Sequence, residues 1–557
     1  MQFTGNPTSG SKKKPSHDLH LKEKALNLPQ SHRYAKRLRS NAEKTPSSLS
    51  NEPVDSAELT LTYEDGTIIL TGLSPAKWAL DEDLPDYLIW DSRIGAYRAP
   101  AHQYRLLKAW VGELRIKSTD LVSGWRHVPN PKFRAPKLRE YQEEAVWAWK
   151  RAATQGIIAL PTGSGKTRVA LSAMALLGLP VLVLVPTRVL MSQWISELKN
   201  VYDGEVGQMG DGVQRLRVVT VSTFESAYRH MERFGNRFGL LVVDEAHHFA
   251  SGLRAEALEM TVAPHRMGLT ATPPKEPEPS MRLMELLGPV VFGKTVTEMA
   301  GTYLAGYETI TLPVTMTPDE ELSYNRHKGL FMGLFRRFKA QNPLGSWPDF
   351  VTWARDESGG TAALRAWHAA RSILSLPKHK KQLVGDLLKR YSQRRVLVFT
   401  RDNASAYDIS KEFLIPAITC HIKSQERKEV LSKFASGEIK ALVSARVLNE
   451  GVDVPEAEVA IITGGSMGER EHLQRVGRVL RPRQNKTAII YDLVVQETTE
   501  SRAAKKHTRA LSIAPGGRAH GLSNTKEQSK KEQSTQEHTD TKGAKKKEKA
   551  TAGVLVI

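Results

Sequence analysis

The 557-residue chain contains one cysteine, Cys420, so an internal disulfide is excluded and a reducing interior is expected. No run of 18 apolar residues occurs, and no apolar segment follows the basic N-terminal stretch, so neither membrane spanning nor secretion is expected. His-x3-His spacing is also missing, which argues against a zinc site at His247 and His248. We expect Cys420 to be a small buried residue beside a strand.

Acidic residues are too few to balance the basic ones, and the net charge is +20. Residues 1–50 carry 10 Lys/Arg against 3 Asp/Glu, and residues 501–557 carry 13 against 5. Both tails are poor in large apolar residues, so we expect them to be disordered. They would either raise nonspecific DNA affinity or only increase solubility. The 40% hydrophobic content suffices for the cores of two to four domains between the tails.

The most informative motif is LPTGSGKT, residues 160–167. It follows an apolar, strand-like run and precedes a segment with helical spacing, 168–177. A glycine-rich turn in this position can direct several backbone N–H groups at one phosphate. Lys166 would reach the β- and γ-phosphates of ATP, and the Thr167 hydroxyl would bind Mg²⁺. The motif is a variant, because Leu160 occupies the position of the usual first glycine.

A second motif, LLVVDEAHHFA at 240–250, places an apolar strand directly before two acidic residues. Parallel strands end at the sheet edge where phosphates bind, so Asp244 can reach the metal. Glu245 is suited to polarise the attacking water as a general base.

The third motif, QRVGRVLRP at 474–482, repeats arginine every three residues and predicts a helix with one basic side. Arg478 and Arg481 are our candidates for arginine fingers that reach the γ-phosphate from a second sheet domain. That sheet would include the buried strand EVAIIT, 458–463.

Other motifs occur in order along the chain: LREYQ (138–142), VPTRVLMSQW (185–194), TVSTFESA (220–227), GLTATP (268–273) and VLVFTRDNASA (396–406). With them the chain resembles superfamily 2 helicases over roughly 350 residues, which implies two RecA-like parallel-sheet motor domains that use ATP and Mg²⁺. The resemblance implies that Gln142 reads adenine, and that nucleotide is also bound by Thr162, Gly163, Ser164, Gly165, Lys166, Thr167, Gly451 and Asp453. It assigns coupling to His247, Thr270, Thr272, Gln474 and Arg475, and strand contacts to Pro186, Thr187, Arg188, Thr223, Thr400 and Arg401.

Within that superfamily the chain resembles XPB-type helicases in their compact archaeal and bacterial form. GTIILTG (66–72) and the segment 90–110 look like the small N-terminal α+β domain that engages distorted duplex DNA, and a helical insertion looks like the DNA-gripping thumb. Two features depart from the family. Pro273 to Pro279 reads PPKEPEP where an Arg-Glu-Asp tripeptide associated with unwinding is expected, and Ala246 replaces the common Val of the acidic box. The prolines predict a stiff, extended segment.

The expected domains are a disordered basic tail (1–56), the N-terminal domain (57–125), helicase domain 1 (126–312), a helical insertion (313–378), helicase domain 2 (379–500) and a second basic tail (501–557). The resemblance implies 3′-5′ DNA helicase or translocase activity in nucleotide excision repair or duplex opening. It implies single-stranded and forked or distorted duplex DNA as partners, a nuclease partner, a monomer without membrane attachment, and a cytoplasmic, nucleoid-associated location in a prokaryote. Alternatives are a duplex translocase or branch-migrating enzyme that does not separate strands, a restriction-type motor, and a nucleic-acid-binding scaffold with a degenerate ATP site.

Overall fold

The computed structural model describes residues 58–73, 84–127, 129–252, 254–445, 457–464, 487–501 and 518–520. The chain divides into two compact units, residues 1–122 and 123–557. Six predicted site residues lie outside the described ranges: Gly451, Asp453, Gln474, Arg475, Arg478 and Arg481. Within the described ranges, no helix has the length and apolar composition needed to cross a bilayer.

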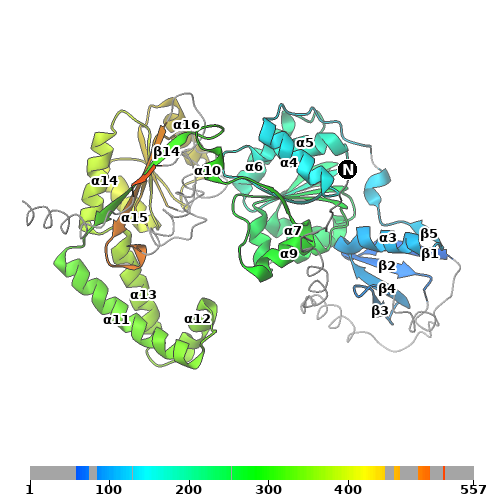
Figure 1. The fold of residues 1–557 in the computed structure, drawn as a ribbon, viewed down its shortest axis with the longest axis horizontal. Helices are drawn as coiled ribbons and strands as arrows, with labels where there is room; N and C mark the ends of the chain where they lie inside the picture. Colours follow the sequence, from blue (N-terminus) through cyan, green and yellow to red (C-terminus); the bar gives the residue numbers. More distant parts are fainter. Residues whose placement is uncertain are drawn as a thin grey trace, which may run out of the picture. The chain divides into compact units, whose positions relative to one another are not determined.

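The first unit contains a five-stranded sheet of order β3-β4-β2-β1-β5, on which helix α3 packs (Figure 1). Strands β1 and β2 form a hairpin: they pair antiparallel, and Asp65 and Gly66 between them both have positive φ, 47° and 80°. The elements are β1 (Glu58–Glu64), β2 (Thr67–Thr71), β3 (Ile89–Asp91), β4 (Ala96–Pro100), η1 (Ala101–Gln103), α3 (Tyr104–Glu113) and β5 (Lys117–Asp120).

The second unit contains two sheets, as expected for two motor domains. The first has the order β13-β6-β12-β11-β7-β10-β8-β9, and its pairs are parallel except β8 with β9. Its strands are β6 (Gln155–Ala159), β7 (Val181–Val185), β8 (Val206–Gly210), β9 (Val213–Arg215), β10 (Val219–Thr223), β11 (Leu240–Asp244), β12 (His265–Thr270) and β13 (Val290–Gly293). The apolar runs of β7 and β11 are buried throughout, as strands covered on both faces must be.

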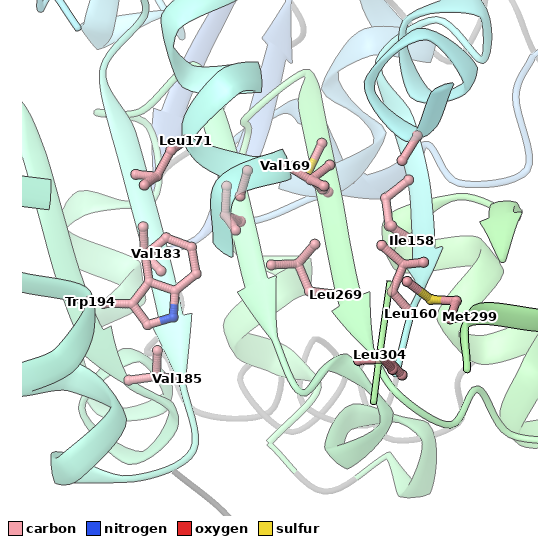
Figure 2. Close-up of a cluster of buried hydrophobic side chains, with 14 of the residues drawn as sticks. Ile158, Leu160, Val169, Leu171, Val183, Val185, Trp194, Leu269, Met299 and Leu304 are labelled. Carbon is pink, nitrogen blue, oxygen red and sulfur yellow. The ribbon is translucent and has the colours of Figure 1, made fainter. Parts of the chain in front are cut away.

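Helices cover both faces of this sheet. Alternation along β7 divides the core, because Val181, Val183 and Val185 face the cluster that includes Val169 and Trp194 (Figure 2), whereas Leu182 and Leu184 face the opposite cluster. The helices of this part are η2 (Gly124–His127), α4 (Glu140–Arg151), α5 (Lys166–Leu177), α6 (Arg188–Lys199), α7 (Phe224–Phe234), η3 (Ala246–Ser251), α8 (Glu256–Glu259), α9 (Pro277–Leu287) and α10 (Val296–Met299).

The other sheet has the order β16-β17-β15-β18-β19-β14-β20, and every described pair in it is parallel. Its elements are β14 (Gly306–Val314), α14 (Lys378–Arg390), β15 (Val396–Phe399), α15 (Asn403–Phe413), β16 (Ala417–Ile418), α16 (Ser424–Ser436), β17 (Ala441–Ser444), β18 (Val459–Ile462), β19 (Thr487–Val495) and β20 (Arg518–His520). The expected boundary between residues 312 and 313 falls inside β14, which pairs with β19 along its whole length. The sheet therefore takes its first strand from upstream of that boundary.

Two smaller expectations were wrong. Cys420 is exposed, because it lies in the loop after the short strand β16. The proline-rich stretch is not extended throughout, since Pro277 occupies the first turn of α9. Proline is favoured there because its φ suits the helix and its missing N–H has no intrahelical partner.

Between β14 and α14 the chain forms three helices, α11 (Pro318–Gln341), α12 (Trp347–Asp356) and α13 (Gly360–Ser375). Phe331, Leu334, Phe335 and Phe338 lie on α11 and pack in a cluster with Phe350 of α12, which is fully buried. Trp347 and Trp367 lie with ring centroids 4.6 Å apart, and the Arg371 guanidinium lies over the Trp367 ring. Side-chain packing thus uses much of the aromatic surface of the insertion.

Candidate ATP site and strand-contacting segments

Three strands of the first sheet bring the predicted ATP site together. Strand β12 lies between β6 and β11, with Thr270 opposite Ala159 and Leu269 opposite Asp244. The strands are parallel, so the phosphate loop after β6 and the acidic residues at the end of β11 lie at the same edge. The sequence predicted that the phosphate loop and the acidic residues lie close together, but it did not predict that β12 separates β6 from β11.

The phosphate loop turns through two glycines in the left-handed region, Gly163 (φ +84°) and Gly165 (φ +78°). Gly165 is the N-cap of α5 and makes no side-chain cap, so the first N–H groups of the helix point out of its end. The Lys166 ammonium donates to the carbonyl oxygens of Leu160 (3.1 Å) and Pro161 (3.3 Å) at the base of the loop. The loop thus gathers one cation and several backbone donors.

Helix α4 braces this loop. The Tyr141 hydroxyl donates to the carbonyl oxygen of Ser164 (2.5 Å), and Gln142 Nε2 donates to the same oxygen (2.9 Å). The φ of Gly165, +78°, favours glycine, and a Cβ there would lie 2.6 Å from Gln142 Nε2, so the Gln142 side chain would have to shift. The sequence predicted Gln142 as an adenine reader but missed Tyr141, whose only signal was an aromatic residue inside the LREYQ motif.

The acidic pair is held by buried partners. Asp244 is 6% exposed, and its Oδ2 accepts a hydrogen bond from the indole Nε1 of Trp194 at 2.9 Å, while its Oδ1 accepts from the Glu245 N–H at 3.0 Å. Glu245 has φ +50°, a left-handed conformation that non-glycine residues adopt rarely, in turns and at strained functional sites. The strand end therefore directs two carboxylates to one edge.

The predicted coupling residues form a chain across β12. His247 Nδ1 lies 3.1 Å from the Thr270 hydroxyl and 3.5 Å from Glu245 Oε2. The Thr272 N–H donates to the Thr270 hydroxyl (3.1 Å), and the Leu160 N–H donates to the Thr270 carbonyl oxygen (2.9 Å). Thr270 therefore contacts both the acidic segment and the base of the phosphate loop.

The predicted strand-contacting residues of the first sheet are mostly at helix starts. Thr187, which follows Pro186, caps α6 by accepting from the Leu190 N–H (3.2 Å), and Thr223 caps α7 in the same way. Arg188 is exposed and forms an ion pair with Asp211 at 3.0 Å. Helix N-termini with an exposed arginine are suited to phosphate contact.

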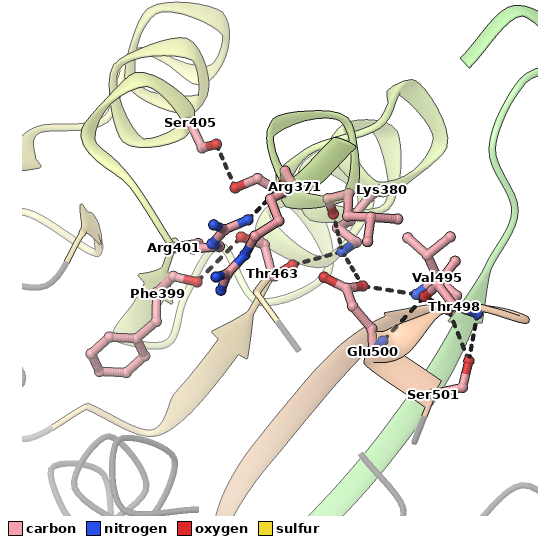
Figure 3. Close-up of polar contacts among 12 residues, drawn as sticks. Arg371, Lys380, Phe399, Arg401, Ser405, Thr463, Val495, Thr498, Glu500 and Ser501 are labelled. Carbon is pink, nitrogen blue, oxygen red and sulfur yellow. Dashed lines mark hydrogen bonds and ion pairs between the residues drawn. The ribbon is translucent and has the colours of Figure 1, made fainter. Parts of the chain in front are cut away.

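In the second sheet, Thr400 is fully buried and Arg401 is partly buried. The Thr400 hydroxyl donates to the Asp402 carbonyl oxygen (2.9 Å), and Arg401 Nη1 donates to the Arg371 carbonyl oxygen (2.7 Å; Figure 3). Thr400 therefore holds the loop after β15 in shape, and Arg401 ties that loop to α13.

The residues at the sheet edge fit a nucleotide with its magnesium ion. The Thr162 hydroxyl in the loop and the Thr272 hydroxyl after β12 are buried and have no hydrogen-bond partner among the residues that the structure describes. Such orphaned donors are rare unless a ligand or water satisfies them. Thr167, in the first turn of α5, and Asp244 supply the hard oxygen ligands that Mg²⁺ prefers.

Family models match along the chain. The model of the xeroderma pigmentosum group B helicase damage recognition domain matches residues 61–122. The model of the type III restriction enzyme res subunit matches 135–275, and that of the helicase conserved C-terminal domain matches 379–483. The middle match contains both the phosphate loop and the acidic strand.

Curated relatives match over most of the chain. The DNA 3'-5' translocase XPB2 of Sulfurisphaera tokodaii is 37% identical over 421 residues, covering 75% of this chain and 95% of the relative. The putative DNA 3'-5' helicase Rad25 of Haloarcula marismortui is 28% identical, covering 81% and 68%. The DNA 3'-5' helicase XPB of Mycobacterium tuberculosis is also 28% identical, covering 67% and 64%.

Proposed function

The chain belongs to the XPB-type superfamily 2 DNA helicases, and from this premise we propose that it couples ATP hydrolysis to 3′-5′ movement along DNA. The observation that carries the proposal is the meeting of the phosphate loop, Asp244 and Glu245 at one edge of a parallel sheet. A cation, backbone donors and two carboxylates in that place suit phosphoryl transfer to water.

Each residue of the edge has a proposed role. Lys166 and the N-terminus of α5 bind the phosphates, and the braced loop keeps these donors in place before binding. Thr167 and Asp244 would hold Mg²⁺, which when bound would neutralise charge on the phosphate oxygens. Glu245 accepts the proton of the attacking water.

Movement requires the site to communicate with DNA. We assign that coupling to His247, Thr270 and Thr272, because they connect the acidic segment to the base of the phosphate loop. Arg188 and the starts of α6 and α7 contact the strand phosphates on the first domain, and the loop after β15 does so on the second. Arg478 and Arg481 remain our candidates for completing the site from the second domain.

Translocation on duplex DNA without strand separation is the second candidate. The stretch 273–279 contains four prolines and lacks the Arg-Glu-Asp tripeptide associated with unwinding in this family, and its second half belongs to α9. A stretch fixed in this way is less suited to act as an adaptable loop. The relative from Sulfurisphaera tokodaii is itself named a translocase.

The test is ATP hydrolysis with single-stranded, duplex and forked DNA, run beside displacement of a labelled strand from a 3′-tailed duplex. Glu245→Gln should lower the DNA-stimulated rate by about 10²-fold or more, the contribution of a general base. Glu197→Gln, which changes an exposed carboxylate near the end of α6, is the matched control and should leave the rate unchanged. Hydrolysis with displacement supports a helicase, hydrolysis without displacement supports a translocase, and no DNA-stimulated hydrolysis contradicts both.

A further inference from the structure

A tryptophan is bonded to the aspartate of the ATP site. The indole Nε1–H of Trp194 donates to Asp244 Oδ2 at 2.9 Å, and the two side chains are only 2% and 6% exposed. Trp194 projects from α6 and lies beside Val183 and Val185 of β7 (Figure 2). Its polar atom is thus brought to the end of β11 from a helix on the face of the sheet.

The bond constrains the orientation of the carboxylate. Within the part of the chain that the structure describes, Asp244 accepts one hydrogen bond on each oxygen, from the indole on Oδ2 and from the Glu245 N–H on Oδ1. Two such bonds fix the rotation of the carboxyl group, and each oxygen retains a lone pair for another ligand. A buried indole N–H needs an acceptor, and a hydrogen bond to a charged group is about twice as strong as a neutral one.

We propose that Trp194 is a positioning residue that holds Asp244 in the orientation required to bind the divalent cation of the nucleotide. This inference rests on the proposed function, because it takes Asp244 as a ligand of Mg²⁺. Groups that hydrogen-bond to metal ligands orient them, and their removal typically weakens metal affinity by about 10- to 100-fold. The printed contacts of the phosphate loop are made by Tyr141, Gln142 and Lys166, whereas the Trp194 N–H is bonded to Asp244. Nucleotide binding without metal should therefore not depend on that N–H.

The variant that tests the proposal is Trp194→Phe, which keeps a buried aromatic ring and removes the N–H donor. Trp149→Phe is the matched control. Trp149 is fully buried in the same core cluster, and its Nε1 donates to a backbone carbonyl oxygen, that of Arg266, at 2.8 Å. Both variants lose one buried indole hydrogen bond and similar volume, but only one of these bonds ends on Asp244.

The measurement is the affinity of the full-length protein for a fluorescent, non-hydrolysable ATP analogue, first in EDTA and then across a MgCl₂ titration. We expect Trp194→Phe to bind as wild type does in EDTA and to require about ten-fold more Mg²⁺ for half of the metal-dependent gain in affinity. Trp149→Phe should match wild type in both conditions. Thermal unfolding of both variants checks that they lose similar stability.

The outcomes separate the two levels of inference. A wild-type protein whose analogue binding does not respond to Mg²⁺ contradicts the proposed function itself. A responsive wild type with the same Mg²⁺ dependence in Trp194→Phe overturns only the positioning role. An equal Mg²⁺ shift in Trp149→Phe, or a parallel loss of binding in EDTA, also overturns it, because the effect then comes from general loosening of the core.

Discussion

Replacement of Lys380 by methionine should be among the most damaging single changes in the second sheet domain. Lys380 lies at the start of α14 and is fully buried, and its ammonium donates to the Leu374 carbonyl oxygen (2.8 Å), the Thr463 carbonyl oxygen (2.7 Å) and Glu500 Oε2 (2.9 Å; Figure 3). Leu374 belongs to α13, Thr463 follows β18 and Glu500 follows β19. One side chain therefore connects the helical insertion to the end of two strands.

The expected loss of folding free energy follows from the burial of the Lys380–Glu500 ion pair. Methionine preserves the unbranched apolar stem but removes the ammonium group that is paired with Glu500, whose side chain is 1% exposed. Removal of one partner of a buried ion pair costs about 3 to 5 kcal/mol. For a domain of 150 to 250 residues, each kcal/mol lowers the melting temperature by about 2 to 4 °C, so we expect a fall of roughly 6 to 20 °C.

Calorimetry of the full-length protein measures the fall, and amide hydrogen exchange of α13 and β18 locates it. Lys381→Met is the control, because the Lys381 ammonium lies 3.4 Å from both Asp408 and Glu412 near the surface, where such pairs contribute about 0 to 1 kcal/mol. The double variant Lys380→Met, Glu500→Gln should recover part of the loss. A Lys380→Met protein as stable as Lys381→Met, or with unchanged exchange in α13 and β18, would show that the buried ion pair does not stabilise this domain.

Two further predictions concern charged residues elsewhere. The bidentate contact with Arg93 and a bond from Arg98 lower the pKa of Asp91 from 3.8 to about 2. The ionised Asp91 therefore stabilises the folded state by about 2 kcal/mol above pH 4, and this stabilisation is lost as the pH falls toward 2. Asp91→Asn should therefore be less stable than wild type at pH 7, with a difference that shrinks in thermal unfolding below pH 4; a constant difference contradicts this cause. Arg188→Ala should weaken DNA binding for every sequence and reduce the slope of log K against log salt by about 1. Asp211→Asn should strengthen DNA binding, because Asp211 competes with DNA phosphate for Arg188. Equal salt slopes in titrations of all three proteins would exclude a phosphate contact.

The parts of the ATP site that the sequence predicted are those whose chemistry lies in adjacent residues. Gly163 and Gly165 adopt the positive φ that a phosphate loop requires, and Asp244 ends an apolar strand, so pattern and backbone geometry coincide. Tyr141 and Trp194 were missed as functional residues because their roles depend on acceptors 23 and 50 residues away along the chain. Nothing in the local pattern distinguishes an aromatic residue that fills the core from one whose polar atom reaches the site.

The fold was predictable for similar reasons. Continuous apolar runs predicted the buried strands β6, β11 and β18. The expected boundary placed most of β14 in the first helicase domain, whereas β14 belongs to the second sheet. An apolar strand does not specify which of two parallel sheets it joins. In addition, β14 is followed along the chain by the helical insertion and not by another strand of its sheet. The predicted burial of Cys420 was wrong because β16 is only two residues long. The chain therefore leaves the sheet before Cys420, earlier than the apolar pattern indicates.

The order of strands in the first sheet shows where the segment 273–279, which differs from the family pattern, lies relative to the ATP site. Strand β12 lies between β6 and β11, and Thr270 at its end contacts both Leu160 and His247. Only residues 273–276 separate Thr272 from the start of α9 at Pro277, and two of the four are proline. The altered segment is therefore a short, stiff continuation of the strand that touches both halves of the ATP site. Phosphate binding depends on β6 and α5, so substitutions at 273–276 should alter DNA-stimulated hydrolysis more than nucleotide affinity.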